Sequence, residues 1–269
     1  MNSDDGQEIP EAVKVQREGK VMRSIRVGML TPSSNTVLER ETYQMIQTIQ
    51  GVSAHFSRLR VKKMTPEAES DRQFESAVML EVARLLEDAQ VDVLAWNGTA
   101  GSWLGPDRDR QLCSDIAGAT GIPTTTSTLA LLDACRIFEV TRLGLATPYV
   151  QELNNQISRC YAQEGIDVVA DEWLGLTDNL DVGSLTSEET RDLVVRAARN
   201  GAQAVAVVCT NVAATPLVQQ LEKQLGIPVF DSITATLWKC LDLVDAPLRP
   251  SGFGALMTTG SERRQAQLL

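Results

Sequence analysis

The chain carries one pattern of short motifs twice, and this internal repeat limits its fold more than any other feature of the sequence. Three landmarks recur in the same order in both copies. The matched pairs are RVGMLTP (26–32) with RLGLATP (142–148), WNGT (96–99) with VVCT (207–210), and GIP (121–123) with GIP (226–228). A repeat that pairs strand ends, helices and turns in order indicates two related halves.

Within each half, short apolar runs rich in β-branched residues alternate with amphipathic stretches. This alternation is typical of a parallel sheet with helices on both faces. We therefore predict an α/β fold with two pseudosymmetric Rossmann-like domains, each built on a central parallel sheet. The predicted strands are 25–30, 91–96, 142–146, 204–209 and the residues around Val229, and the predicted helices are 75–88, 107–120, 128–138, 150–165, 187–200, 216–225 and 234–243.

The repeat and the local composition also predict how the chain is divided. Residues 1–20 are polar and lack helical or strand periodicity, so we expect a flexible N-terminal arm. The first half is predicted to span 21–130, with 235–257 returning to it, and the second half 131–234. Residues 258–269 are predicted to form a C-terminal tail.

Composition excludes several classes of function. The 25 basic and 35 acidic residues give a formal net charge of -10, so no general basic field attracts a nucleic acid. No apolar run is long enough to cross a bilayer and no signal-peptide pattern opens the chain, so we expect a cytoplasmic protein without a membrane partner. Five widely spaced cysteines without a CxxC pair, and His55 as the only histidine, predict neither a disulfide framework nor a metal site.

Polar clusters follow the predicted strands, at the places where open α/β sheets bind ligands. TPSSNT (31–36) supplies neutral donors at a predicted helix start, with Ser34 and Asn35 as candidates for holding a carboxylate or simply for capping the helix. NGTAGS (97–102) has small residues that let a ligand approach the backbone, but it lacks the lysine of a phosphate-binding loop. With the two corresponding clusters of the second half, these strand ends predict one shared cleft.

The second half offers a phenol and a thiol at its strand ends. Tyr149 directly follows a strand, where it can donate a hydrogen bond to developing negative charge or simply pack. Cys209 follows the apolar run 204–208, and N–H groups beside it are expected to lower its pKa and make a thiolate available. The remaining cysteines lie inside predicted helices and are expected to be small buried residues: Cys113, Cys135, Cys160 and Cys240.

Several of these clusters form one set of motifs. The set comprises PSSNT (32–36), LATPY (145–149) with ELN (152–154), DNL (178–180), CTN (209–211) and the closing RPSGFG (249–254). Together the motifs resemble the maleate isomerase and arylmalonate decarboxylase branch of the aspartate/glutamate racemase superfamily, over residues 25–256. The resemblance implies two pseudosymmetric domains with the active site in the cleft between them, no cofactor, a small carboxylate substrate, and compatibility with a homodimer.

The resemblance also implies roles for particular residues. Racemases and maleate isomerases of this superfamily place one cysteine on each side of the substrate, whereas arylmalonate decarboxylases have glycine on the first side. Here Gly98 stands at the first position and Cys209 at the second. A lone thiol can protonate an enediolate from one face after carbon dioxide leaves. Thr99, Tyr149 and the N–H of Thr210 would then bind the developing oxyanion.

Three functions stay open from the sequence. The first is decarboxylation of a small substituted malonate or dicarboxylate, with Cys209 as proton donor and with Ser34 and Asn35 holding carboxylate oxygens. The second is cis–trans isomerisation of maleate, with Cys209 as nucleophile and with Asn35, Tyr149 and Asn179 anchoring the two carboxylates. The third is carboxylate binding without catalysis, if the missing first cysteine removed the activity.

Three further residues bear on the predicted pocket. Ala100 stands where the related enzymes usually offer a serine hydroxyl, so one donor is missing. Trp96 and Trp103 flank the small-residue loop and either shape a pocket for an apolar substituent or pack in the core. The predicted catalytic residues are Cys209, Tyr149 and Thr99, and the predicted substrate-binding residues are Ser34, Asn35, Gly98, Ala100, Asn179 and Thr210.

Overall fold

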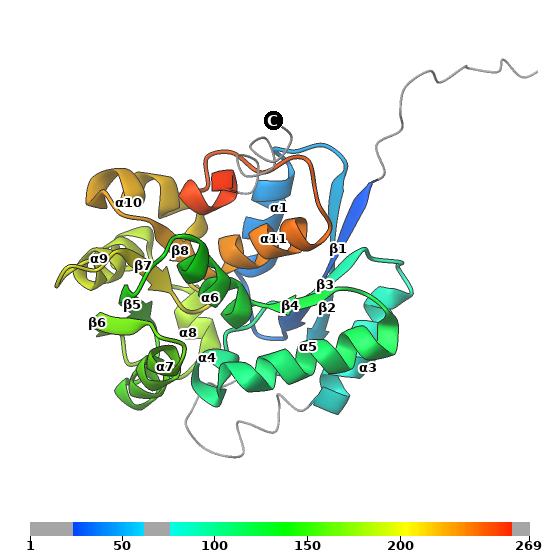
Figure 1. The fold of residues 1–269 in the computed structure, drawn as a ribbon, viewed down its shortest axis with the longest axis horizontal. Coiled ribbons are helices and arrows are strands. Elements are labelled where there is room, and N and C mark those ends of the chain that lie inside the picture. The colour runs from blue at the N-terminus through cyan, green and yellow to red at the C-terminus, as the bar shows by residue number, and fades with distance from the viewer. Residues whose placement is uncertain (1–23, 62–75, 260–269) are drawn as a thin grey trace, which may run out of the picture.

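A computed structural model of the protein describes residues 24–61 and 76–259 (Figure 1). The predicted arm, 1–20, lies outside the described residues, as does 260–269 of the predicted tail. The described chain forms two four-stranded parallel sheets with helices packed around them. This arrangement confirms the predicted α/β fold class.

The first sheet has the spatial order β2-β1-β3-β4. Its strands are β1 (Ile25–Pro32), β2 (Val52–Leu59), β3 (Val93–Trp96) and β4 (Thr124–Thr126). The helices of this half are α1 (Leu38–Ile46), α3 (Ser76–Glu87), α4 (Gly101–Leu104), α5 (Pro106–Thr120) and α6 (Ser127–Ile137).

The second sheet has the matching order β6-β5-β7-β8. Its strands are β5 (Arg142–Thr147), β6 (Asp167–Trp173), β7 (Ala204–Val207) and β8 (Val229–Asp231). The following helical elements belong to this half or close the chain: α7 (Gln151–Gln163), α8 (Asn179–Gly183), α9 (Ser187–Ala197), the 3₁₀ turn η2 (Thr215–Leu217), α10 (Val218–Leu225) and α11 (Ser232–Leu243).

The matching strand orders show that the sequence repeat is also a structural repeat. β1 and β5, which carry the first landmark, each lie between an edge strand and a second central strand. The second central strands, β3 and β7, are buried along their whole length, as strands covered by helices on both faces should be. β7 ends at Val207, earlier than predicted, so Cys209 stands in the loop just beyond the strand.

Two glycines of the repeat allow close packing against the central strands. Gly28 in β1 and Gly144 in β5 occupy corresponding positions of the two copies. A Cβ added at Gly144 would lie 2.1 Å from the carbonyl oxygen of Ala197 in α9, whereas one at Gly28 would meet only side chains. The missing Cβ at Gly144 therefore lets α9 approach the backbone of β5 directly.

A buried carboxylate fixes the helix that follows the last strand of each sheet. Asp231 caps α11 by accepting from the Thr234 N–H (3.1 Å), and it also accepts from the Thr215 hydroxyl (2.6 Å). In the first half Thr126 caps α6 and donates to the carboxylate of Asp109 on α5 (2.5 Å). Each half therefore has a hydrogen bond between a threonine hydroxyl and an aspartate carboxylate at this place. The capping residue supplies the hydroxyl in the first half and the carboxylate in the second. Burial raises the pKa of both carboxyl groups to about 6.

The two halves are joined through the helices at their boundary. α6 and α11 pack against each other in the middle of the molecule (Figure 1). α11 also contacts β3 and β4 of the first sheet and β8 of the second, so it connects both halves. None of the helices within residues 24–61 and 76–259 is long and apolar enough to cross a membrane.

Candidate active site

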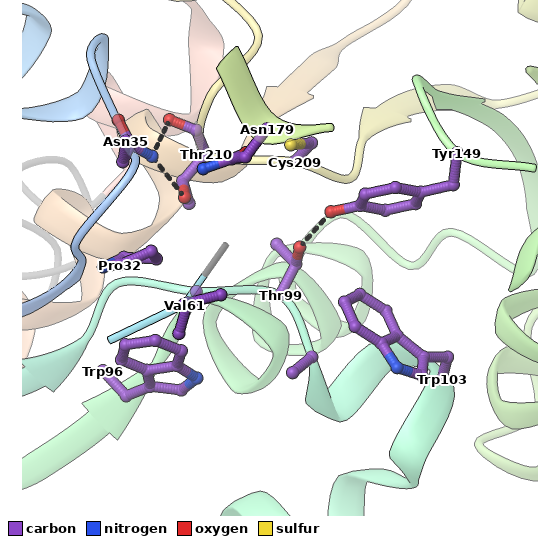
Figure 2. A pocket seen from close by; sticks show the side chains of 12 residues that line it. Pro32, Asn35, Val61, Trp96, Thr99, Trp103, Tyr149, Asn179, Cys209 and Thr210 are labelled. Carbon is purple, nitrogen blue, oxygen red and sulfur yellow. Dashed lines mark hydrogen bonds between the residues drawn. The ribbon is translucent and has the colours of Figure 1, made fainter. Parts of the chain in front are cut away.

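A small cavity of about 30 Å³ lies beyond the carboxyl ends of the central strands, where segments of the two halves meet (Figure 2). Its lining includes residues that follow β1, β2 and β3 in one half and β5 and β7 in the other. The described lining residues are Pro32, Asn35, Val61, Trp96, Gly98, Thr99, Ala100, Trp103, Tyr149, Asn179, Cys209 and Thr210. This position is the one where ligands bind in open parallel sheets.

The Cys209 thiol is buried at the second-half side of the cavity, with 4% of the residue exposed. Burial raises its pKa and outweighs the opposing effect of hydrogen bonds from the Tyr149 hydroxyl and from the backbone N–H groups of Asn211 and Val212. The Asn211 N–H lies 3.4 Å from Sγ. The expected N–H donors are therefore present, but the expectation that they lower the pKa of this thiol overall is wrong. Cys209 carries its proton at neutral pH.

Tyr149 and Thr99 face each other across the cavity from opposite halves. The Tyr149 hydroxyl lies 3.0 Å from Oγ1 of Thr99, and Trp103 meets the phenol ring edge-on at 5.3 Å between centroids (Figure 2). Burial, and then the nearby Cys209, raise the pKa of Tyr149 well above its usual value. The phenol is therefore a neutral donor that can turn toward negative charge in the cavity.

Asn35 joins the two halves beside the cavity. Its Oδ1 accepts from the N–H groups of Val37 and Leu38 at the start of α1, at 2.9 and 3.0 Å. Its Nδ2 donates to the carbonyl oxygen and to Oγ1 of Thr210, at 3.0 and 3.2 Å. In this conformation both ends of the Asn35 amide are hydrogen-bonded to other parts of the protein. Asn35 would therefore have to exchange a bond with Thr210 for one with a substrate carboxylate.

Ser34 is the predicted site residue that is absent from the described cavity lining. Its hydroxyl donates to the carbonyl oxygen of Val61 (2.5 Å) and accepts from Nδ2 of Asn179 (2.9 Å). Asn179 does line the cavity, and its own carbonyl oxygen accepts from the side chain of Asn211 (2.5 Å). In this conformation Ser34 orients Asn179 from behind.

The apolar lining contains residues that the sequence identified only in part. Trp96 and Trp103 both line the cavity. Trp96 is also only 1% exposed, so it both shapes the pocket and packs in the core. Pro32 was seen only as part of a polar cluster. Val61 was missed because it is an ordinary valine after β2, a strand that the sequence did not predict.

The lining has little charge and one sulfur. Among the described lining residues none has an ionised side chain at neutral pH, and Cys209 is the only cysteine. The other cysteines lie in helices, as predicted, and burial raises the pKa of Cys113, Cys135 and Cys240 to about 12. His55 lies in β2 beside Ser53 and is not part of the described lining.

A metal site is not evident in the described part of the chain. Within residues 24–61 and 76–259, no three His, Cys, Asp or Glu side chains are grouped so that they could hold a metal ion. The donors that face the cavity are hydroxyl, amide, thiol and backbone N–H groups. Such a set can bind an anion by neutral hydrogen bonds and can move one proton through the thiol.

Comparison with known proteins gives relatives that extend over most of the chain. The maleate isomerase of Geobacillus stearothermophilus is 29% identical and covers 88% of this chain and 98% of its own length. The arylmalonate decarboxylase of Bordetella bronchiseptica is 27% identical, over 86% of this chain and 95% of its own. A structure of Nocardia farcinica maleate cis-trans isomerase, a cysteine-to-serine mutant with a covalently bound succinylcysteine intermediate, superposes with a TM-score of 0.80 at 25% identity, covering 87% of this chain and 98% of that one.

A family model agrees with these relatives. The model described as arylmalonate decarboxylase matches residues 27–257, which include both sheets and every described residue of the cavity lining. The chain therefore belongs to the arylmalonate decarboxylase family of enzymes, in the maleate isomerase and arylmalonate decarboxylase branch of the aspartate/glutamate racemase superfamily.

Proposed function

We propose that this enzyme is a cofactor-independent decarboxylase that acts on a small substituted malonate or similar dicarboxylate. The observation that carries the proposal is the single thiol among the described cavity residues, which has a raised pKa and therefore a proton to give. Proton delivery from one side is sufficient for decarboxylation, because loss of carbon dioxide itself creates the carbanion equivalent.

The reaction balances with Cys209 as the only proton donor. The bond between the central carbon and one carboxylate breaks, carbon dioxide leaves, and the electron pair stays on the substrate as an enediolate. The thiol proton then moves to the central carbon, which leaves a thiolate. A proton from water restores the thiol for the next turnover, and the product keeps one carboxylate.

Neutral donors around the thiol support the enediolate. Thr99 and Tyr149 can both turn their hydroxyl groups toward a developing oxyanion, and Thr210 can add its backbone N–H from the second half. Donors that are aimed at such charge before the reaction are worth about 3 kcal/mol each in barrier height. In this proposal Asn35 and Asn179 hold the remaining carboxylate, with Asn35 giving up a bond to Thr210.

The apolar part of the cavity lining also favours decarboxylation. Trp96, Val61 and Pro32 line part of the cavity and offer little to solvate an ionised group. A carboxylate held against them loses hydration, whereas neutral carbon dioxide needs none. This loss of hydration raises the free energy of the bound substrate more than that of the transition state that leads to carbon dioxide, so it lowers the barrier.

The alternative is cis–trans isomerisation of maleate by addition of Cys209 to the double bond. The maleate isomerase relatives favour it, with identities up to 29%. The N. farcinica isomerase keeps a succinylated cysteine when another cysteine is replaced, so its natural chain has at least two. The described cavity here has one, and that one is protonated at neutral pH, which fits a proton donor better than a nucleophile.

A product screen tests the proposal. Purified protein is incubated with methylmalonate, phenylmalonate and maleate, while carbon dioxide and fumarate are measured. We expect carbon dioxide from a substituted malonate, lost in Cys209→Ala and kept in Cys113→Ala, which removes a thiol that is not among the described lining residues. Fumarate from maleate without carbon dioxide from any malonate would contradict the proposal and establish the isomerase.

A further inference from the structure

The side of the cavity that lacks a thiol is occupied by an indole ring. A Cβ built on Gly98 would lie 2.3 Å from Cζ2 and 2.5 Å from Cε2 of Trp96, and 3.0 Å from Cη2. These three atoms are its nearest neighbours, and all belong to the same ring. Trp96 therefore fills the space that any side chain at position 98 would need.

The backbone is not the reason for the glycine. Gly98 lies outside the positive-φ region that favours glycine, unlike Gly105 or Gly121. A side chain at position 98 is thus acceptable for the backbone, and the three atoms that its Cβ would meet first all belong to Trp96. The indole cannot yield easily, because Trp96 is 1% exposed and its ring is rigid.

The ring and the thiol lie on different sides of the pocket. Figure 2 shows Trp96 at one side, near Val61, and Cys209 at the other, with Thr99 between them and Tyr149 on the side of Cys209. Trp96 is one of the residues that line this cavity of only about 30 Å³. The size of the pocket therefore depends directly on this ring.

We propose that Trp96 is the specificity-determining residue of the site. Its indole excludes any side chain at position 98, and so keeps the site one-sided with Cys209 as the lone thiol. The same ring limits the size of the substituent that a substrate can carry. The steric part of the proposal concerns only this chain, whereas the substrate part rests on the proposed function.

A double-mutant cycle tests the steric part without any substrate. We compare the Tm of the wild-type protein with those of Gly98→Ala, Trp96→Leu and the double variant. Overpacking should lower the Tm of Gly98→Ala by about 2–10 °C. In the Trp96→Leu background the same alanine should cost much less, since the ring atoms it would meet are gone.

Two controls match the two positions. Gly118→Ala places a Cβ on α5 where nothing lies within 4 Å, so it should not lower the Tm. Trp103→Leu removes the other tryptophan of the cavity, and it should not relieve Gly98→Ala. A Gly98→Ala protein with the wild-type Tm, or one whose loss is unchanged by Trp96→Leu, would overturn the proposal, and an insoluble Gly98→Ala that Trp96→Leu rescues would support it.

Substrate preference tests the second part. Relative to wild type, Trp96→Leu should raise the ratio of kcat/KM for phenylmalonate over methylmalonate at least about tenfold. An unchanged ratio in an active variant would overturn the role in specificity. If the wild-type protein released no carbon dioxide from either acid, the proposed function would fail while the Tm cycle still decided the steric part.

The double variant Trp96→Leu with Gly98→Cys tests whether the indole stands opposite the thiol. With a malonate that carries both a methyl and a phenyl group, whose product 2-phenylpropionate is chiral, it should gain racemisation of that product, measured as loss of optical activity, and Cys209→Ser should abolish that gain. Gly98→Cys alone should lose Tm because the indole is still present. A folded double variant that turns over the methyl- and phenyl-substituted malonate but never racemises 2-phenylpropionate would overturn the opposed placement.

Discussion

Cys209 is a thiol held in its protonated form by its surroundings. Its sulfur receives hydrogen bonds from Tyr149 and from two backbone N–H groups, yet burial dominates and keeps the pKa above the usual value. A residue of this kind suits proton donation and is poorly prepared for nucleophilic attack at neutral pH. The two possible chemistries of the site therefore respond to pH in opposite ways.

The pH dependence of kcat/KM should identify the chemistry of Cys209. A proton donor must be protonated, so carbon dioxide release should stay level from neutral pH upward and fall only above the ordinary thiol pKa of about 8.5. The fall should approach tenfold per pH unit and should be absent from the residual activity of Cys209→Ser. An increase in rate across the same range would contradict the donor role and indicate a thiolate nucleophile.

Tyr149 should act through its hydroxyl rather than through packing alone. Tyr149→Phe keeps the ring and its edge-on contact with Trp103, and removes the donor that faces Thr99. We expect kcat to fall by about 10²–10³ with little change in Tm. Steady-state kinetics and thermal unfolding of the same preparation check this, and an unchanged kcat would assign Tyr149 to packing.

The chemistry at single residues was only partly predictable from sequence. Cys209, Tyr149 and Thr99 stand out because each follows a strand, and strand ends of parallel sheets gather at one edge. The contact between Trp96 and Gly98 depends on a side-chain direction that no motif encodes. The pKa of Cys209 depends on how deeply the thiol is buried. The sequence indicates the N–H donors beside the thiol but does not indicate its burial.

At the scale of secondary structure, the central strands were predictable and most edge strands were not. β1, β3, β5 and β7 are mostly apolar and mostly buried, as strands covered on both faces should be. β2 and β6 are edge strands with polar residues among the apolar ones, and β4 is only three threonines. The start of the helix after β1 was predicted at 31–36, but its range was not, because charged residues interrupt its apolar positions.

Corresponding glycines of the repeat should differ in their tolerance of a side chain. Gly144→Ala would press a Cβ on the carbonyl oxygen of Ala197, which is backbone and cannot rotate away, so we expect a loss of about 3 kcal/mol or more. Gly28→Ala meets side-chain carbons of Leu94 and Val91 at 2.9 Å and should cost less. Urea unfolding of both variants checks the order, and equal losses would contradict the direct approach of α9 to β5.

At the scale of the whole molecule, the buried carboxyl groups of the two halves predict how stability depends on pH. Asp109 and Asp231 have a pKa of about 6 when folded, against about 3.9 in an unfolded chain. Between these values the folded protein binds more protons, so the stability that each contributes is present below about pH 4 and is lost as the pH rises through 6. The loss is up to about 3 kcal/mol for each group.

Replacing one carboxyl group isolates this effect from the other titrations of the chain. Asp109→Asn keeps an oxygen for the Thr126 hydroxyl and cannot ionise. The difference in unfolding free energy between variant and wild type should shift in favour of the variant as the pH rises from 4 to 7. Urea unfolding across this range measures the difference, and a constant difference would show that Asp109 does not titrate there.

The repeat predicts the two-sheet architecture and places one cleft between its halves. The two halves no longer match at the cavity, because Cys209 stands in one and Gly98, covered by Trp96, stands in the other. A site with a thiol on one side only should deliver a proton to one face of the substrate only. This asymmetry is the central claim about how the enzyme works.

Stereochemistry of decarboxylation in heavy water tests that claim most directly. The substrate is a malonate with two different substituents, such as methyl and phenyl, and the product is analysed for deuterium and for enantiomeric ratio. We expect one deuterium at the central carbon and a single enantiomer, with turnover lost in Cys209→Ala. A racemic product from the wild-type enzyme, or the same enantiomer formed at the same rate without Cys209, would contradict proton delivery from one thiol on one face.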